Sequence, residues 1–178
     1  MVVNRQLRRR CEQAIADLDV PQPIDIHKLC QVLSERNGRP IHLLPMKLPV
    51  NSPCGMWVRT TAFDAVFYEA ETSVLHQLQI IGHELGHLIG GHQASEVLDA
   101  QASRLLLPDL DPALVRRFLG RSNYSRDEER EAEMIGSLLV KQADLSTAPA
   151  PADTPPELTD IMNRLQHSLA HHRRSPHG

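Results

Sequence analysis

SVLHQLQIIGHELGHLIGG, residues 73–91, carries the longest helical pattern in the chain. Its apolar residues recur at alternating spacings of four and three, which places them along one face of a helix. They are Val74, Leu78, Ile81, Leu85 and Leu88. Thr72 or Ser73 can cap the start of this helix, and Gly90-Gly91 is typical of a helix end. The stretch therefore predicts a helix from about residue 73 to residue 89 with one buried stripe.

Two further helices and a small sheet are predicted on the N-terminal side. Apolar residues at helical spacing predict a helix over residues 4–18, and a second helix follows Asp25, which has the chemistry of an N-cap. Asn37-Gly38 is expected to end that second helix. We expect three strands, the last two forming a hairpin, at 41–44, 56–60 and 65–69. The last of these strands could align an extended peptide by strand addition.

The C-terminal side is predicted to be helical. Residues 95–107 and 111–119 have the pattern of short helices. Ser125 with Glu128 three residues later forms a capping-box pattern, which predicts a longer helix ending near residue 145. The fold class expected from these elements is α+β, mainly helical, with a sheet of about three strands packed on the 73–89 helix.

The chain divides into one domain and a tail. Residues 1–146 are predicted to form the domain, because all the elements above lie within them. Residues 147–156 read TAPAPADTPP, a Pro/Ala linker that we expect to be stiff and unpacked. Residues 157–178 are expected to form a last amphipathic helix with a frayed end.

Composition and charge exclude several classes of protein. The 178 residues contain no apolar run near the length of about 20 that a membrane span needs, and no signal peptide is recognised. The net charge of −3 argues against a dedicated nucleic-acid binder, so we expect no direct nucleic-acid contact. Three widely spaced cysteines are typical of a reducing, cytoplasmic setting. The expected protein is cytoplasmic and does not bind a membrane.

His83-Glu84-Leu85-Gly86-His87 is the HExxH pattern within the longest helix. Histidines at i and i+4 leave the same helix face one turn apart, at the separation that a zinc ion accepts. Glu84 then lies beside the open coordination position, where it can act as a general base. The pattern therefore predicts a Zn²⁺ site with His83 and His87 as ligands.

Catalytic zinc needs a third protein ligand, and two candidates are open. His92 is close in sequence, but a third histidine in the HExxHxxGxxH pattern would stand at Gln93, so His92 is more typical of a surface or outer-shell residue. The second candidate is a glutamate of the helix that follows Ser125. A helical wheel puts Glu128 and Glu129 at the borders of its buried face and points Glu131 most nearly to solvent.

HELGH followed by a helix that reads EREAE, residues 129–133, resembles the ImmA/IrrE family of metallopeptidase-like proteins, relatives of the gluzincins, and especially its short actinobacterial or phage-type members. The resemblance covers about residues 5–145. It implies a zincin-like fold with Glu129 as the third ligand. The family has Asp or Asn four residues after that ligand, and Glu133 stands there in this chain.

The family resemblance implies a zinc endopeptidase that cleaves a helix-turn-helix transcriptional repressor. Zinc-activated water would attack the peptide, and Glu84 would serve as general base and acid. Candidate outer-shell residues or oxyanion donors are Glu133, Tyr68, Tyr124 and His92. The alternative is a non-proteolytic regulatory or toxin–antitoxin component that uses the zinc fold to bind a partner protein. In both cases the expected partner is a protein, such as a helix-turn-helix regulator.

Overall fold

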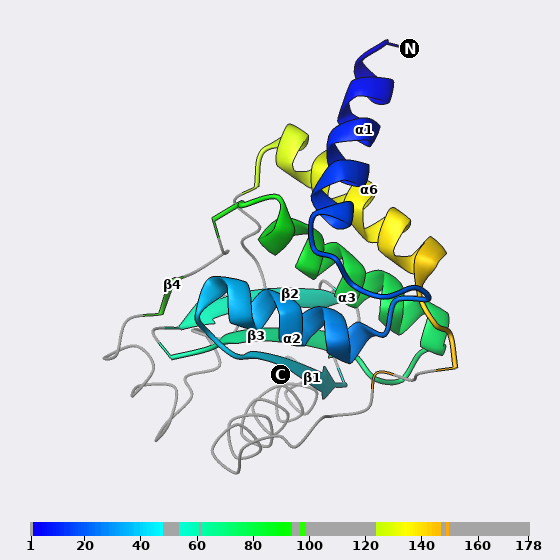
Figure 1. Cartoon of the computed structure of the whole chain (residues 1–178). Helices are drawn as coiled ribbons and strands as arrows, with labels where there is room; N and C mark the ends of the chain where they lie inside the picture. Colours follow the sequence, from blue (N-terminus) through cyan, green and yellow to red (C-terminus); the bar gives the residue numbers. More distant parts are fainter. Residues whose placement is uncertain are drawn as a thin grey trace, which may run out of the picture.

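Helices and one small mixed sheet make up the part of the chain that the computed structural model describes, residues 2–47, 54–60, 62–93, 97–98, 124–146 and 149 (Figure 1). The described helices are α1 (Val2–Ala16), α2 (Ile26–Asn37), α3 (Val74–Ile89) and α6 (Arg126–Gln142). The strands are β1 (Ile41–Met46), β2 (Gly55–Thr60), β3 (Asp64–Glu69) and the two-residue β4 (Val97–Leu98). The predicted α+β class is confirmed.

The sheet has the order β1-β3-β2-β4. β3 lies in the centre, parallel to β1 and antiparallel to β2, so the predicted hairpin is confirmed. Because β3 is paired on both sides, the prediction that residues 65–69 align a peptide by strand addition is wrong. Val97–Leu98 pairs with the end of β2, which corrects the prediction of a helix over 95–107 at those two residues. The rest of 95–107 and all of 111–119 lie outside the described residues.

The helix ends follow the capping chemistry of the sequence. Asp25 accepts hydrogen bonds from the backbone N–H groups of His27 and Lys28, and Gly38 ends α2 in the left-handed conformation with φ of 67°. Ser73 caps α3, and Ser125 with Glu128 forms the full capping box of α6. The predicted starts of all three helices are confirmed. α6 ends at Gln142, three residues before the predicted end.

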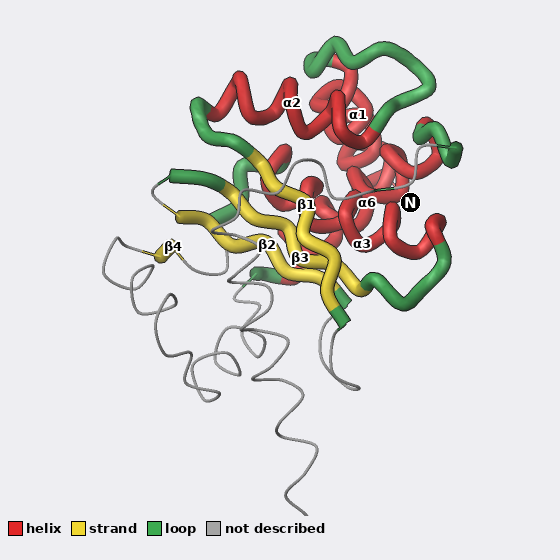
Figure 2. The backbone as a smooth tube through the Cα atoms, turned by 90° about the horizontal axis from the view of Figure 1, so that it is seen from below, coloured by secondary structure: helices red, strands yellow, loops and turns green. Residues whose placement is uncertain are grey.

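The helices and the sheet enclose one apolar core. α3 packs on β2 and β3, α6 runs along α3, and α1 packs on α6, while α2 covers β1 (Figure 2). The buried side chains include most of the stripe predicted for α3, together with residues from each of the other helices and the three longer strands. The largest fully buried ones are Trp57, Tyr68, Leu29, Leu44, Leu78, Ile81, Leu85 and Ile135.

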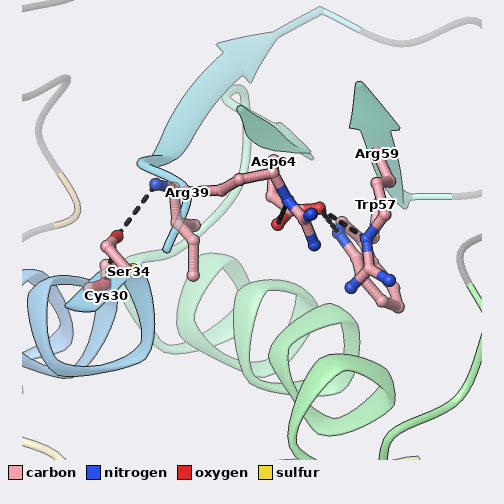
Figure 3. Close-up of polar contacts among 7 residues, drawn as sticks. Cys30, Ser34, Arg39, Trp57, Arg59 and Asp64 are labelled. Atoms are coloured by element: carbon pink, nitrogen blue, oxygen red, sulfur yellow. Dashed lines mark hydrogen bonds and ion pairs between the residues drawn. The ribbon is translucent and has the colours of Figure 1, made fainter. Parts of the chain in front are cut away.

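A buried carboxylate fixes one end of the sheet (Figure 3). Asp64, the fully buried first residue of β3, accepts a hydrogen bond of 3.0 Å from the indole N–H of Trp57. Its two oxygens also face Arg39 at 3.3 Å and Arg59 at 3.2 Å. A buried carboxylate is costly unless it is paired in this way, so the cluster ties β3 to β2 and to Arg39, two residues before β1.

The predicted linker and C-terminal helix, residues 147–156 and 157–178, lie outside the described residues except for Pro149. Pro149 is buried, and its carbonyl accepts a hydrogen bond of 2.6 Å from the Tyr68 hydroxyl. At this residue the expectation of an unpacked linker is wrong. Among the described residues, no helix has the combined length and apolar character needed to cross a bilayer.

Candidate metal centre

The two histidines of HELGH converge on one point beside α3. His83 Nε2 and His87 Nε2 lie 3.2 Å apart, with the two rings nearly perpendicular. The apolar stripe of α3 faces the core, and this orientation leaves His83 half-buried and His87 fully buried. The predicted pairing of these imidazoles on one helix face is confirmed in the structure.

Glu129 reaches the same point from α6. Its Oε2 atom lies 3.5 Å from His83 Nε2 and 3.9 Å from His87 Nε2. Glu128 cannot take this place, because its carboxylate accepts the Ser125 backbone N–H of the capping box at 2.7 Å. The structure thus distinguishes the two glutamates at the borders of the buried face, and Glu129 is the one that faces the histidines. His83, His87 and Glu129 form a group that could hold a metal ion.

The spacing of the three atoms fits a small divalent ion. Ligands of a tetrahedral ion with bonds of about 2.0–2.1 Å lie about 3.3 Å apart. The three observed separations, 3.2, 3.5 and 3.9 Å, are close to that value. Two imidazole nitrogens and one carboxylate oxygen would leave a fourth position open, the arrangement typical of catalytic rather than structural sites.

Small residues let α6 approach α3 closely enough to deliver Glu129. A Cβ atom on Gly136 would lie 2.9 Å from the backbone of both Gly82 and His83. Real Cβ atoms do not approach backbone so closely, so the two helices touch backbone to backbone at this point. This contact places the first turns of α6, and therefore Glu129, beside the two histidines.

His87 is held as a neutral ring. Burial lowers its pKa to about 3, with further lowering from His83 and His92 nearby. Tyr124, the residue before the N-cap of α6, stacks on the His87 ring with centroids 3.6 Å apart and an interplanar angle of 17°. A neutral imidazole keeps the lone pair that metal coordination requires.

Glu84 lies under β2 at the edge of the site. Its side chain is buried, and a Cβ on Gly55 of β2 would lie 3.0 Å from its Oε1. Burial raises the pKa of Glu84 to about 8, the Trp57 backbone N–H opposes that shift, and the Glu129 carboxylate adds to it. With this pKa the carboxyl group is mostly protonated at neutral pH when no cation lies beside it.

The remaining sequence candidates lie in different places. Tyr68 does not offer its proton to the site, because its hydroxyl donates to the Pro149 carbonyl. Glu133 is exposed on α6, and the structure gives it no contact with the two histidines. Tyr124 contacts His87 through its ring, as described above. His92 is buried against the Nδ1 side of the His87 ring, and the Nε2 side of that ring faces His83 and Glu129.

The exposure that the helical wheel predicts for Glu131 is wrong. The wheel points it to solvent, whereas its side chain is only 20% exposed and lies between Arg10 of α1 and His92. Packing of α1 on α6 covers this side of the helix, and a wheel of α6 alone carries no information about α1. The stacking of Tyr124 was also missed as a role, since a loop residue has no periodic pattern to place it.

Searches against family models, curated proteins and solved structures find no match to this chain. The resemblance to the ImmA/IrrE family therefore rests on HELGH and EREAE alone.

Proposed function

We propose that the protein is a zinc-dependent endopeptidase of the zincin type, as the resemblance to the ImmA/IrrE family implies. The observation that carries the proposal is the convergence of Glu129 Oε2 with the Nε2 atoms of His83 and His87 from a different helix. Two imidazoles and one carboxylate are a ligand set of catalytic zinc in peptidases. Bound zinc supplies Lewis acidity, which acidifies a water ligand and polarises a substrate carbonyl.

Glu84 is the residue proposed to move the proton. Its carboxylate would accept the proton of the attacking water and pass it to the leaving amine nitrogen. The hydrogen bond from the Trp57 backbone holds the carboxylate, and a cation held beside it would lower the pKa of Glu84 and favour the ionised form that accepts the proton. His87, neutral and clamped by Tyr124, would hold the metal without competing for that proton.

β2 is the strand proposed to align the substrate. Glu69 N–H donates to Cys54 O across the β2–β3 ladder, so the backbone groups of Gly55 and Trp57 face away from β3. Among the described residues, β4 pairs only with Arg59 and Thr60 on that side. The Trp57 N–H on this side is taken by the Glu84 carboxylate, so the groups on which an extended peptide could be bound by strand addition are those of Gly55 and the Trp57 carbonyl.

By the family resemblance, the substrate would be a helix-turn-helix repressor in the cytoplasm. The test replaces Glu84 by Gln, which keeps the size and the hydrogen bond but removes the base. We expect zinc to stay bound and cleavage of a co-expressed repressor to fall by about 10²–10⁴-fold. Glu133→Gln, an exposed glutamate on α6, is the matched control and should cleave normally.

The same variant separates the two functions considered from the sequence. If Glu84→Gln binds zinc and still cleaves the repressor, the peptidase assignment is wrong. If the wild type cleaves nothing and Glu84→Gln keeps the cellular phenotype, the non-proteolytic regulatory or toxin–antitoxin role replaces it.

A further inference from the structure

The end of α3 returns the chain onto the metal site. Gly91 adopts φ of 71°, and the backbone N–H groups of Gly91 and His92 donate to the carbonyls of Leu88 and His87 at 3.2 and 3.0 Å. These two bonds define a Schellman motif, in which the residue after the left-handed glycine lies over the helix residue five positions earlier. The motif therefore places His92 over His87.

The His92 ring is fitted tightly into this position. A Cβ on Gly90 would lie 2.7 Å from His92 Nε2 and 2.9 Å from its Cε1, so a larger residue at position 90 would require the ring to shift. His92 is 7% exposed. Its Nδ1 lies 3.0 Å from Nδ1 of His87, the ring nitrogen that faces away from the metal ligands.

This contact fixes where the protons sit. His87 Nε2 points at His83 and Glu129, so it must be unprotonated to act as a ligand. The proton of the neutral His87 ring is then on Nδ1 and is donated to His92 Nδ1. A His92 ring that accepts at Nδ1 carries its proton on Nε2, and this atom lies 3.6 Å from Glu131 Oε2, an electrostatic contact rather than a hydrogen bond.

The chain of contacts continues to the N-terminal helix. Glu131 Oε1 accepts a hydrogen bond of 2.8 Å from the guanidinium of Arg10 on α1. Each member thus orients the next, from Arg10 through Glu131 and His92 to His87. Three separate elements, α1, α6 and the turn after α3, contribute to the setting of one ligand ring.

We infer that His92 is a positioning residue of the metal site, anchored by Glu131 and Arg10, which holds His87 in the tautomer and orientation that metal binding needs. Ligand histidines commonly donate their second N–H to a carboxylate, a carbonyl or water, and loss of such a partner typically weakens metal binding by about 10–100-fold. Here a second histidine takes that role. The inference rests on the metal site of the proposed function and not on peptidase activity.

The test measures zinc affinity of the full chain by competition with a chromophoric chelator. His92→Leu removes the acceptor and should weaken zinc binding by about 10–100-fold. His92→Asn, whose side-chain oxygen can occupy the Nδ1 position, should recover most of that loss. Unchanged affinity in His92→Leu, or equal losses in the Leu and Asn variants, would overturn the inference.

A surface variant tests Arg10, the last residue in this series of contacts, without disturbing the core. Arg10→Gln should weaken zinc binding, by less than His92→Leu, because Glu131 keeps its place on α6. Arg9→Gln is the matched control, since Arg9 is an exposed arginine next to it on α1. Equal affinities in Arg10→Gln and Arg9→Gln would show that α1 plays no part in positioning.

Nitrogen NMR of the metal-free wild type gives a readout that is independent of metal and of activity. His87 should be neutral with its proton on Nδ1, and His92 should accept at Nδ1. A His87 ring protonated on Nε2 would overturn the inference even if zinc never binds. If the wild type shows the expected tautomer but no zinc affinity, the proposed function fails and the positioning contact stands.

Discussion

Gly86 of α3 and Ala132 of α6 are in backbone contact: a Cβ on Gly86 would lie 2.5 Å from the Ala132 carbonyl oxygen. Gly86 is the fourth residue of HELGH, and Ala132 is one helical turn after Glu129. The contact that brings the helices together therefore lies next to the candidate ligands on both of them, His87 on α3 and Glu129 on α6. The packing of the two helices and the geometry of the candidate metal site depend on this one contact.

Gly86→Ala is expected to disturb both the packing of the two helices and the geometry of the candidate metal site. The added methyl forces α3 and α6 apart and should lower the free energy of unfolding by about 1–3 kcal/mol, although alanine favours the helix. Because the movement carries Glu129 away from His83 and His87, zinc affinity should fall as well. Urea unfolding and chelator competition measure the two effects.

Gly82→Ala is the control for this prediction. Its Cβ would lie 3.2 Å from the Gly136 carbonyl oxygen, a milder contact on the same helix. We expect smaller losses of stability and of affinity. A Gly86→Ala protein as stable as the wild type, with unchanged zinc affinity, would show that helix separation does not set the site.

Asp64→Asn should weaken the sheet rather than the metal site. The change leaves Arg39 and Arg59 facing a neutral amide in a buried position. Loss of one partner of a buried ion pair costs about 3–5 kcal/mol, and the partial exposure of the arginines favours the lower end. Chemical denaturation should show the loss, while the folded variant keeps its zinc affinity. An unchanged unfolding midpoint would mean that the carboxylate is not a structural lock.

Tyr68 should make the stability of the fold fall with rising pH in the alkaline range. Burial raises its pKa from 10.0 to about 12, so above pH 10 the unfolded chain loses this proton first and stability falls until about pH 12. Tyr68→Phe should show a shallower decline over that range. It should also be less stable at neutral pH by about 1–3 kcal/mol, because the buried Pro149 carbonyl loses its donor.

A tyrosinate absorbance titration checks the cause. The chain has two tyrosines, so in Tyr124→Phe only Tyr68 contributes to the signal. Its midpoint should lie well above 10 in the folded protein. A midpoint at the ordinary value would contradict burial of the hydroxyl.

Local chemistry made much of the fold predictable. Asp25, Ser73 and Ser125 fixed helix starts because their side chains cap helices without help from the rest of the chain. HELGH predicted that His83 and His87 lie together, since the spacing of i and i+4 positions is a property of any helix. α6 has one buried face, as the helical wheel assumes, and Ala132 and Ile135 lie on it.

Long-range packing set the parts that local patterns could not predict. The parallel pairing of β1 with β3 and the short strand β4 depend on tertiary arrangement. Glu131 is covered only because α1 packs against α6. The position of His92 did have a local signal, because a glycine pair that ends a helix directs the following residue back over it.

Zinc binding by the metal-free chain, compared with that of Glu129→Ala, tests the central claim most directly. We predict one zinc ion per wild-type chain and, in Glu129→Ala, a loss of affinity larger than the about 10–100-fold typical of an outer-shell partner. Glu133→Ala, which removes an exposed glutamate of the same helix, should keep the wild-type affinity. A wild type that binds no zinc, or a Glu129→Ala protein that binds it as tightly, would contradict the account.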